Sequence, residues 1–423
     1  MLDIKFIREN AVLVKEAVRK KHLMLEVDKL LAVDAKRLEL LRAVEAARAE
    51  QNTTGEKIAT ATDKTALVSA MTELKEKLKK QEDELSAVMK DWQKLMLDVP
   101  NLPDVSVPEG ETDADNQEIK VWGEKPKFSF TPKSHIELLT ANGLTDFERG
   151  TKVAGFRGYV LGRGAVSLSF ALWQLALNFL TTRGFEAMLV PSLVKRENLI
   201  GTGYLPAGAP DLYATQDGDY LAGTAEVPVM GCFADEILSL ESLPKKIVAF
   251  SPCFRREAGS HGKDVKGLMR LHEFFKVEQV VLSEAKHDES VRLHEELLAN
   301  AEAIMQALGL PYRVVINCGG DLGLGAVKKY DLEVWVPTEG KYRETHSISY
   351  FHDFQTRRLN IRYRSAEGRP LFAHSLNGTA LATPRLLIPF VEHYQQPDGS
   401  IAVPEILRPY LGGLTVLEHG QSA

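Results

Sequence analysis

The sequence predicts an α+β protein in which an N-terminal antiparallel two-helix coiled-coil arm precedes a mostly antiparallel sheet flanked by helices. Apolar residues recur in steps of four and three between 67 and 95, which is the seam pattern of a coiled coil. Short β-branched runs at 245–250 and 276–282 flank a long basic loop, which indicates two antiparallel strands. The two prolines of DVPNLP (98–103) separate the two patterns.

These patterns divide the chain into three expected parts. A helical N-terminal domain covers 1–103, with its arm at about 27–98. The acidic, Pro- and Gly-containing segment 104–120 is expected to be a linker. The α+β domain then occupies 121–423.

Composition narrows the class of protein. With 44% hydrophobic and 26% charged residues among 423, the chain resembles an ordinary soluble two-domain protein. A net charge of −6 means that any nucleic-acid partner must be held by a local basic patch. The N-terminus lacks a continuous apolar stretch, and the longest apolar run, 168–180, is too short for a membrane span. Three cysteines far apart in the sequence, Cys232, Cys253 and Cys318, predict buried reduced thiols and a cytoplasmic protein.

The arm supports two interpretations. Its second helix has the stronger seam, interrupted at Gln81, and the polar segment 59–66 is expected to form the tip. For a coiled coil alone, dimerisation or spacing is favoured over RNA binding. Its charges are mixed, so each lysine near the tip or along the second helix is either a phosphate contact or a solubilising surface residue: Lys57, Lys64, Lys75, Lys77, Lys79 and Lys80.

The stretch 254–278 carries the densest chemistry in the chain. It begins with Arg255, Arg256 and Glu257 and returns to an aromatic pair that includes Phe274. Arginines clamp phosphates and an aromatic ring stacks on a base, so these residues suit an ATP site. A solvated basic hairpin is equally compatible with the same residues.

Two further stretches are ambiguous when read alone. Thr224, Ala225 and Glu226 follow a strand-like run, where a hydroxyl and a carboxylate suit a small polar amine, although Thr224 also suits a helix N-cap. The stretch 147–168 is expected to form strand-like pieces with glycine turns.

The motifs together resemble one family. FRxEAG followed by HxFxKVE (254–278) looks like motif 2 of a class II aminoacyl-tRNA synthetase, and specifically that of the bacterial seryl-tRNA synthetase family. GFEAMLVPSLV (184–194) is similar to motif 1, and HSLNGTALATPR (374–385) resembles motif 3. The resemblance extends from residue 1 to about 413. It implies ATP and Mg²⁺ at the site, and a homodimer formed through motif 1 near Pro191.

The resemblance also implies roles for individual residues. Arg255 would clamp the serine carboxylate and the ATP α-phosphate, with Arg385 at the γ-phosphate as the second catalytic arginine. Glu257 would hold the adenine amino group, on which Phe274 stacks, and Arg256 belongs to the same nucleotide site. Glu278 would bind the serine ammonium and also its hydroxyl. The serine pocket would consist of Thr224, Ala225, Glu226, Arg255, Glu278, Asn377 and Thr379.

The Mg²⁺ site and motif 3 depart from the usual family pattern. Glu344 and Ser347 would hold Mg²⁺ through ATP phosphates, within a nucleotide-binding stretch that also contains Thr345 and His346. His346 invites a metal-ligand interpretation, but a lone histidine is more often a structural hydrogen-bonding group. In motif 3, Thr379, Ala380 and Pro384 stand where the family usually has Ser, Gly and Gly.

The implied function is serine–tRNA ligation: serine is activated with ATP to seryl-adenylate and transferred to the 3′ end of tRNA(Ser), which the arm binds. Whether tRNA(Sec) is charged as well stays open. Two alternatives are a paralogue that loads an amino acid onto a carrier protein and a catalytically inactive binding protein. The arm disfavours the first alternative, and the presence of Arg255, Glu278 and Arg385 disfavours the second.

Overall fold

The computed structural model describes residues 1–259, 262 and 264–418. The chain divides into two compact units, Met1–Pro100 and Asn101–Ala423, which are described separately. Part of the basic loop, residues 260, 261 and 263, lies outside the described residues.

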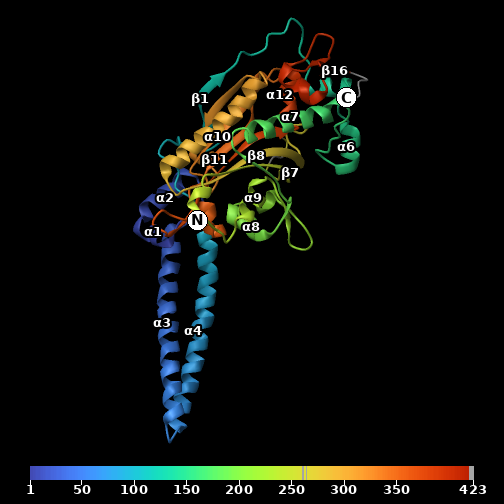
Figure 1. Cartoon of the computed structure of the whole chain (residues 1–423). Coiled ribbons are helices and arrows are strands. Elements are labelled where there is room, and N and C mark those ends of the chain that lie inside the picture. Colours follow the sequence, from blue (N-terminus) through green and yellow to red (C-terminus); the bar gives the residue numbers. More distant parts are fainter. Residues whose placement is uncertain (260–261, 263, 419–423) are drawn as a thin grey trace. The chain divides into compact units, whose positions relative to one another are not determined.

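The first unit is entirely helical. Two short helices, α1 (Ile4–Glu9) and α2 (Ala11–Lys20), precede the long helices α3 (Val27–Thr60) and α4 (Thr65–Leu97), which run antiparallel to each other (Figure 1). A 34-residue helix is about 50 Å long, so α3 and α4 form an extended pair. A small cluster that contains Val44, Ala47, Leu74 and Leu78 closes the seam between them.

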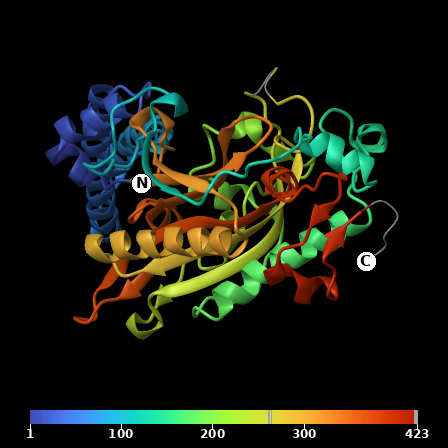
Figure 2. The same cartoon turned by 90° about the horizontal axis from the view of Figure 1, so that it is seen from above.

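The second unit is built on an eight-stranded sheet in the order β1-β9-β10-β11-β14-β8-β7-β2. All neighbours in it are antiparallel except β2 and β7. Figure 2 shows this sheet from above, crossed by the helices that cover it. Its strands are β1 (Gln117–Trp122), β2 (Glu186–Leu189), β7 (Lys245–Phe254), β8 (Glu273–Ser283), β9 (Tyr312–Ile316), β10 (Lys328–Val336), β11 (Lys341–Tyr350) and β14 (His374–Thr383).

Alternation along the central strands sends side chains to two different layers. On β8, Val277 and Val281 join the main core beneath α7 (Gly164–Thr181) and α10 (His287–Ala307). Val280 and Leu282 pack on the opposite face, in a cluster with residues of α9 (Glu226–Cys232). The remaining helices are α5 (His135–Ala141), α6 (Phe147–Ala154), α8 (Arg196–Thr202), α11 (Phe354–Leu359) and α12 (Leu387–His393).

Short strands complete the unit. They form two three-stranded sheets and one two-stranded sheet: β3 (Leu193–Val194), β4 (Tyr213–Ala214), β5 (Tyr220–Leu221), β6 (Ile237–Leu238), β12 (Arg362–Arg364), β13 (Pro370–Phe372), β15 (Ile401–Ala402) and β16 (Val416–Leu417). The architecture confirms the predicted fold class. By length and composition alone, helix α7 could cross a membrane, since its mean hydropathy is 1.3. In the structure, however, nine of its residues are buried, and several of them belong to the main core.

Three local expectations differ from the structure. The end of the expected linker 104–120 is strand β1, because residues from Gln117 pair with β9 at the edge of the sheet. Phe147–Ala154 is helix α6 and not strand-like, since Asp146 caps it by accepting a hydrogen bond from the Arg149 amide. Cys253 and Cys318 are buried, but Cys232 is exposed at the last turn of α9.

Candidate functional site

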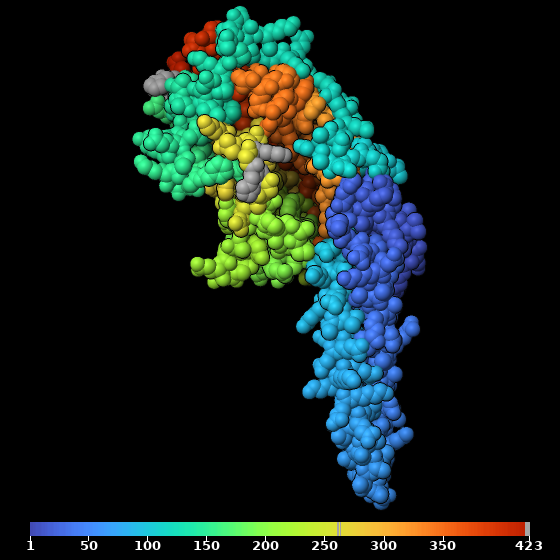
Figure 3. Space-filling model, turned by 180° about the vertical axis from the view of Figure 1, so that it is seen from behind, coloured from blue at the N-terminus to red at the C-terminus, as the bar shows by residue number. Residues whose placement is uncertain are grey.

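A cavity of about 540 Å³ lies on the α9 side of the large sheet. Figure 3 shows this unit hollowed between the yellow and orange parts of its surface. Strands β8, β11 and β14 supply the floor, and the loops before α9 and around α8 supply a wall. Because alternate residues of a strand face the same side, residues 274, 276 and 278 all reach the cavity from β8.

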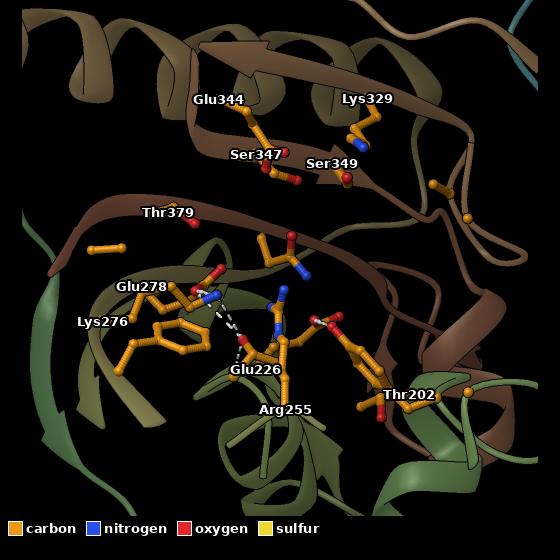
Figure 4. Close-up of a pocket in the computed structure, with 18 of the residues that line it drawn as sticks. Thr202, Glu226, Arg255, Lys276, Glu278, Lys329, Glu344, Ser347, Ser349 and Thr379 are labelled. Atoms are coloured by element: carbon orange, nitrogen blue, oxygen red, sulfur yellow. Dashed lines mark hydrogen bonds and ion pairs between the residues drawn. The ribbon is translucent and has the colours of Figure 1, made fainter. Parts of the chain in front are cut away.

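The inner end of the cavity is a closed polar network (Figure 4). Thr224, Glu278 and Lys276 are 1%, 2% and 6% exposed. The Lys276 ammonium forms an ion pair with Glu278 Oε2 and donates a hydrogen bond to Thr224 Oγ1 at 3.0 Å. Thr224 Oγ1 accepts from the Glu226 amide at 3.2 Å and donates to Glu278 Oε2 at 3.4 Å. Every member of this network therefore has a fixed partner before any substrate arrives.

Glu226, also buried, is held by uncharged donors. Tyr204 Oη donates to its Oε2 at 2.9 Å, and Gln355 Nε2 donates to its Oε1 at 2.6 Å. Ser375 Oγ in turn donates to Gln355 Oε1 at 2.7 Å, which fixes the amide. Burial, and then the negative charge of Glu278, raise the pKa of the Glu226 carboxyl. Because its charged form is destabilised in this way, the Glu226 carboxylate would be stabilised strongly by a cation that a ligand brings.

Arg255 stands between the two ends of the cavity. Its side chain donates through Nε and Nη2 to the Gly223 carbonyl, each at 3.3 Å. The guanidinium carbon lies 5.2 Å from the centre of the Phe274 ring. The arginine is thus anchored by backbone and aromatic contacts, and it suits an anion that lies between an amino-acid end and a nucleotide end.

The outer end is more open. Arg385 donates through Nε to the Met269 carbonyl at 3.1 Å and through Nη1 to the Glu344 carbonyl at 3.3 Å. The carboxylate of Glu344 is 3.9 Å from the Arg385 guanidinium, and its side chain is 48% exposed. Ser347 lines the cavity from the same strand, β11.

Glu257 lies at the rim and is positioned by arginine. Arg270 Nη1 donates to Glu257 Oε2 at 3.0 Å, while Arg270 Nε donates to Asp264 at 3.2 Å. Asp264 also accepts from Arg343 at 2.6 Å, so the two arms of the basic loop are tied to β11.

Most of the residues expected at the site line this cavity: Thr224, Glu226, Arg255, Glu257, Phe274, Glu278, Glu344, Thr345, Ser347, Asn377, Thr379 and Arg385. Three do not. Ala225 is fully buried at the start of α9, and Arg256 is exposed, with its amide bonded to the Asp211 carbonyl. His346 points to the other face of β11, as alternation requires.

His346 makes structural hydrogen bonds. Its ring nitrogens lie 2.7 Å from Thr345 Oγ1 and 3.1 Å from the Ala380 carbonyl. Burial lowers its pKa to about 4, so the ring is neutral near pH 7. Of the altered motif 3 residues, Thr379 and Pro384 line the cavity, whereas Ala380 is buried behind it.

Sequence reasoning missed four polar residues of the site. Tyr204 comes from the loop after α8 and Gln355 from α11, both far from any motif, and no local pattern marks them. Lys276 lies inside the KVE triplet, but only its burial shows its contact with Glu278. Lys329 reaches the cavity from β10 beside Asp331, whose pKa burial raises to about 7.

The chemistry of the outer end fits Mg²⁺. A carboxylate and a hydroxyl, Glu344 and Ser347, face one cavity, and oxygen ligands are those that Mg²⁺ prefers. Among the described residues, no group of three or more His, Cys, Asp or Glu side chains forms a protein-only metal cage. One or two protein oxygens with phosphate and water completing the shell is the usual arrangement for Mg²⁺ at a nucleotide.

Comparisons with known proteins agree with this geometry. Residues 1–103 match the model of the seryl-tRNA synthetase N-terminal domain. Residues 213–394 match the model of the tRNA synthetase class II core domain (G, H, P, S and T). A serine–tRNA ligase of Deinococcus radiodurans is 46% identical over 420 residues, which cover 99% of each chain. One of Thermomicrobium roseum is 45% identical over 98% of this chain and 94% of that protein.

Solved structures match over the full length. The crystal structure of seryl-tRNA synthetase from Pyrococcus horikoshii complexed with ATP has a TM-score of 0.90 and 36% identity, and covers 100% of both chains. That of the cytoplasmic serine–tRNA ligase from Naegleria fowleri in complex with AMP has a TM-score of 0.87 and 32% identity, covering 100% of this chain and 99% of that one. On fold, sequence and site together, the chain belongs to the seryl-tRNA synthetase family of class II aminoacyl-tRNA synthetases.

Proposed function

We propose that this chain activates serine with ATP and transfers it to the 3′ end of tRNA(Ser). The observation that carries the proposal is one cavity with two different ends joined at Arg255. The buried inner end offers carboxylates and hydroxyls of a size for a small polar amino acid. The open outer end offers arginines, an aromatic ring and Mg²⁺-type oxygens for a nucleotide.

In the first step, a serine carboxylate oxygen attacks the α-phosphorus of ATP. The P–O bond to the β-phosphate breaks, and pyrophosphate leaves with the electron pair. Arg255 binds both the serine carboxylate and the α-phosphate, so it aligns the two reacting groups and stabilises the charge that develops between them. No side-chain nucleophile takes part.

The two buried carboxylates select the amino acid. Glu226 and Glu278 face the ammonium and the hydroxyl of serine, together with Thr224, Asn377 and Thr379. An amino acid without the hydroxyl leaves buried polar groups unpaired, which gives strong rejection. The extra methyl of threonine is excluded by volume, which is worth about 1–3 kcal/mol.

The nucleotide occupies the outer end. Phe274 stacks on adenine, Glu257 accepts from its amino group, and Arg385 binds the terminal phosphate. Glu344 and Ser347 would hold Mg²⁺, which would neutralise phosphate charge when bound. The match to a seryl-tRNA synthetase solved with ATP supports this placement.

In the second step, the terminal ribose 3′-hydroxyl of tRNA attacks the seryl carbonyl, and AMP leaves. We propose that the α3–α4 arm binds tRNA(Ser), because RNA helices are commonly recognised through backbone and shape. The match of residues 1–103 to the family's N-terminal domain supports this role. The enzyme would act in the cytoplasm, where translation takes place.

We also propose a homodimer formed near Pro191. Strand β2 is an edge strand of the large sheet, and an unpaired edge is open to a partner. Leu189 on β2, two residues before Pro191, is 80% exposed, and Phe170 on α7 is 63% exposed, so both elements present apolar side chains to solvent. Sedimentation of the purified chain as a monomer at micromolar concentration would contradict this proposal.

The test of the function is amino-acid-dependent ATP–pyrophosphate exchange, measured without tRNA, over serine, threonine, alanine, glycine and cysteine. Serine-dependent exchange is the expected result. Exchange with another amino acid would change the substrate and implicate Thr379. A folded protein with no exchange would favour an inactive paralogue. Aminoacylation of tRNA(Ser) and tRNA(Sec) then tests the second step.

A further inference from the structure

The two buried carboxylates of the serine pocket have different partners. Glu278 is in direct contact with a cation, the Lys276 ammonium. Glu226 is bonded to a phenol and an amide, and among the residues that the structure describes no cation lies within ion-pair distance of it. The two carboxylates therefore cannot be equivalent toward a ligand that carries one ammonium and one hydroxyl.

We propose that Lys276 is a positioning residue that makes this pocket select a neutral hydroxyl side chain. Lys276 neutralises the charge of Glu278, so Glu226, and not Glu278 as the family resemblance implies, is the carboxylate left to bind the substrate ammonium. Glu278 then acts as a hydrogen-bond acceptor for the serine hydroxyl. The inference rests on the proposed function, because it assigns the ammonium of serine to Glu226 and the hydroxyl of serine to Glu278.

The contacts of Glu278 support this division. Both the Lys276 ion pair and the Thr224 hydrogen bond fall on Oε2, so Oε1 is the oxygen left toward the substrate. Thr379 lies directly opposite Glu278 in the β8–β14 register and also lines the cavity. Figure 4 shows Lys276 and Glu278 side by side on β8 and pointing toward each other.

The charges inside the pocket support it as well. At the inner end, the formal charges of Arg255 and Lys276 balance those of Glu226 and Glu278, so zwitterionic serine adds no net charge to this end. A side chain with a second ammonium would meet Lys276 as a like charge, which is costly where water is excluded. Removing the lysine charge should invert that preference, since Glu278 would then lack a counter-ion.

The experiment compares Lys276→Met with the parent enzyme in ATP–pyrophosphate exchange at mildly acidic pH. The probe is 2,3-diaminopropionate, which is serine with an amine in place of the hydroxyl and which carries a proton on both amines under these conditions. In K276M, the serine KM is expected to rise about tenfold or more, because Glu278 no longer keeps its geometry. The inhibition constant of 2,3-diaminopropionate is expected to fall by a similar factor, while the KM for ATP stays within about twofold.

Three variants separate charge from packing. Lys276→Arg keeps the charge and should retain the preference for serine over the diamine. Lys246→Met removes another lysine–glutamate ion pair, the 2.6 Å contact between Lys246 on β7 and Glu296 on α10. Neither residue lines the cavity, so both constants should stay unchanged. The double variant K276M/E278Q removes both charges, and should again discriminate against the diamine even if K276M is poorly folded.

The outcomes distinguish two failures. If serine KM and diamine inhibition constant rise together in K276M, Lys276 only packs and the inference is overturned. The same conclusion follows if K276M/E278Q binds the diamine as well as K276M does. Absence of serine-dependent exchange in the parent enzyme would instead overturn the proposed function itself.

Discussion

The two ends of the cavity are built on different principles. At the inner end, Thr224, Glu226, Lys276 and Glu278 are nearly inaccessible to solvent, and each has a protein partner. At the outer end, the Glu344 side chain is half exposed and meets Arg385 only at 3.9 Å. A small amino acid must be recognised by a site that is already formed, because few contacts are available to reorganise it.

The outer, nucleotide end does not need to be fully formed before its ligand binds. ATP brings several charges and a base, so it contributes the contacts that complete the outer site. The difference predicts that substitutions at the inner end change amino-acid selection, whereas those at the outer end change the use of ATP and Mg²⁺. Arg255, anchored to Gly223 and Phe274, belongs to both ends.

Replacement of Arg255, which belongs to both ends of the cavity, should have the largest effect on the comparison between these ends. Arg255→Ala should lower kcat/KM for exchange by about a thousandfold or more, equivalent to about 4 kcal/mol, because the guanidinium is proposed to stabilise charge that develops in the transition state. Steady-state exchange with serine and ATP varied separately measures the loss. Arg292→Ala on the surface of α10 is the control, since the ion-pair partners of Arg292 within the described part of the chain are Glu289 and Glu296 of its own helix. A loss confined to one substrate's KM would assign Arg255 to one end alone.

A substitution confined to the inner end comes next in size. Glu226→Gln keeps the shape but removes the charge proposed to bind the serine ammonium. The serine KM should rise about a hundredfold, or about 2–3 kcal/mol, as expected for a hydrogen bond to a charged group in a buried site. The ATP KM should stay unchanged. A parallel rise in both KM values would show that the two ends are not independent.

The sequence predicted the arm and the catalytic strands because both carry local signals. The seam of α4 repeats every three or four residues, and β7 and β8 have β-branched runs on either side of the basic loop. The comparisons confirm the family and the fold class that these signals and motifs indicated. Strand β1 and helix α6 were missed, since a polar edge strand and a short capped helix have weak local patterns.

The site shows the same difference between residues that local sequence patterns predict and residues that only tertiary packing brings together. Arg255, Glu278 and Glu344 lie in motifs with fixed spacing, and the structure brings them to one cavity. The partners that tune them come from elsewhere: Tyr204 and Gln355 are brought to Glu226 only by tertiary packing. The assigned roles of all these residues stay predictions, and the two substitutions below test the smaller effects.

Glu344→Ala examines the outer end alone. Loss of this carboxylate should raise the Mg²⁺ concentration needed for half-maximal exchange about tenfold, because it removes one of the two protein groups, Glu344 and Ser347, proposed to bind Mg²⁺. The melting temperature should change by no more than about 1 °C, since the side chain is half exposed. Mg²⁺ titrations at saturating ATP and serine provide the measurement, and a serine-specific defect would contradict the division into two ends.

The smallest effect is a pH shift at Glu226. Its pKa is raised by burial and then by Glu278, so serine binding should weaken as the pH falls through that raised value and the carboxyl becomes neutral. Tyr204→Phe removes a hydrogen bond that favours the charged carboxylate, so the acidic limb of kcat/KM for serine should move to higher pH, with a few-fold loss at neutral pH.

The pH dependence of folding stability should have the opposite sign to the pH dependence of serine binding. A raised carboxyl pKa means that the folded chain binds the proton more tightly than the unfolded chain does. The contribution of Glu226 is therefore present at low pH and is lost as the pH rises through its folded-state pKa. Urea unfolding of Tyr204→Phe and of E226Q across this range checks the sign, because E226Q should remove the dependence. If the acidic limb of the kcat/KM profile for serine does not move in Tyr204→Phe, a group other than Glu226 controls serine binding.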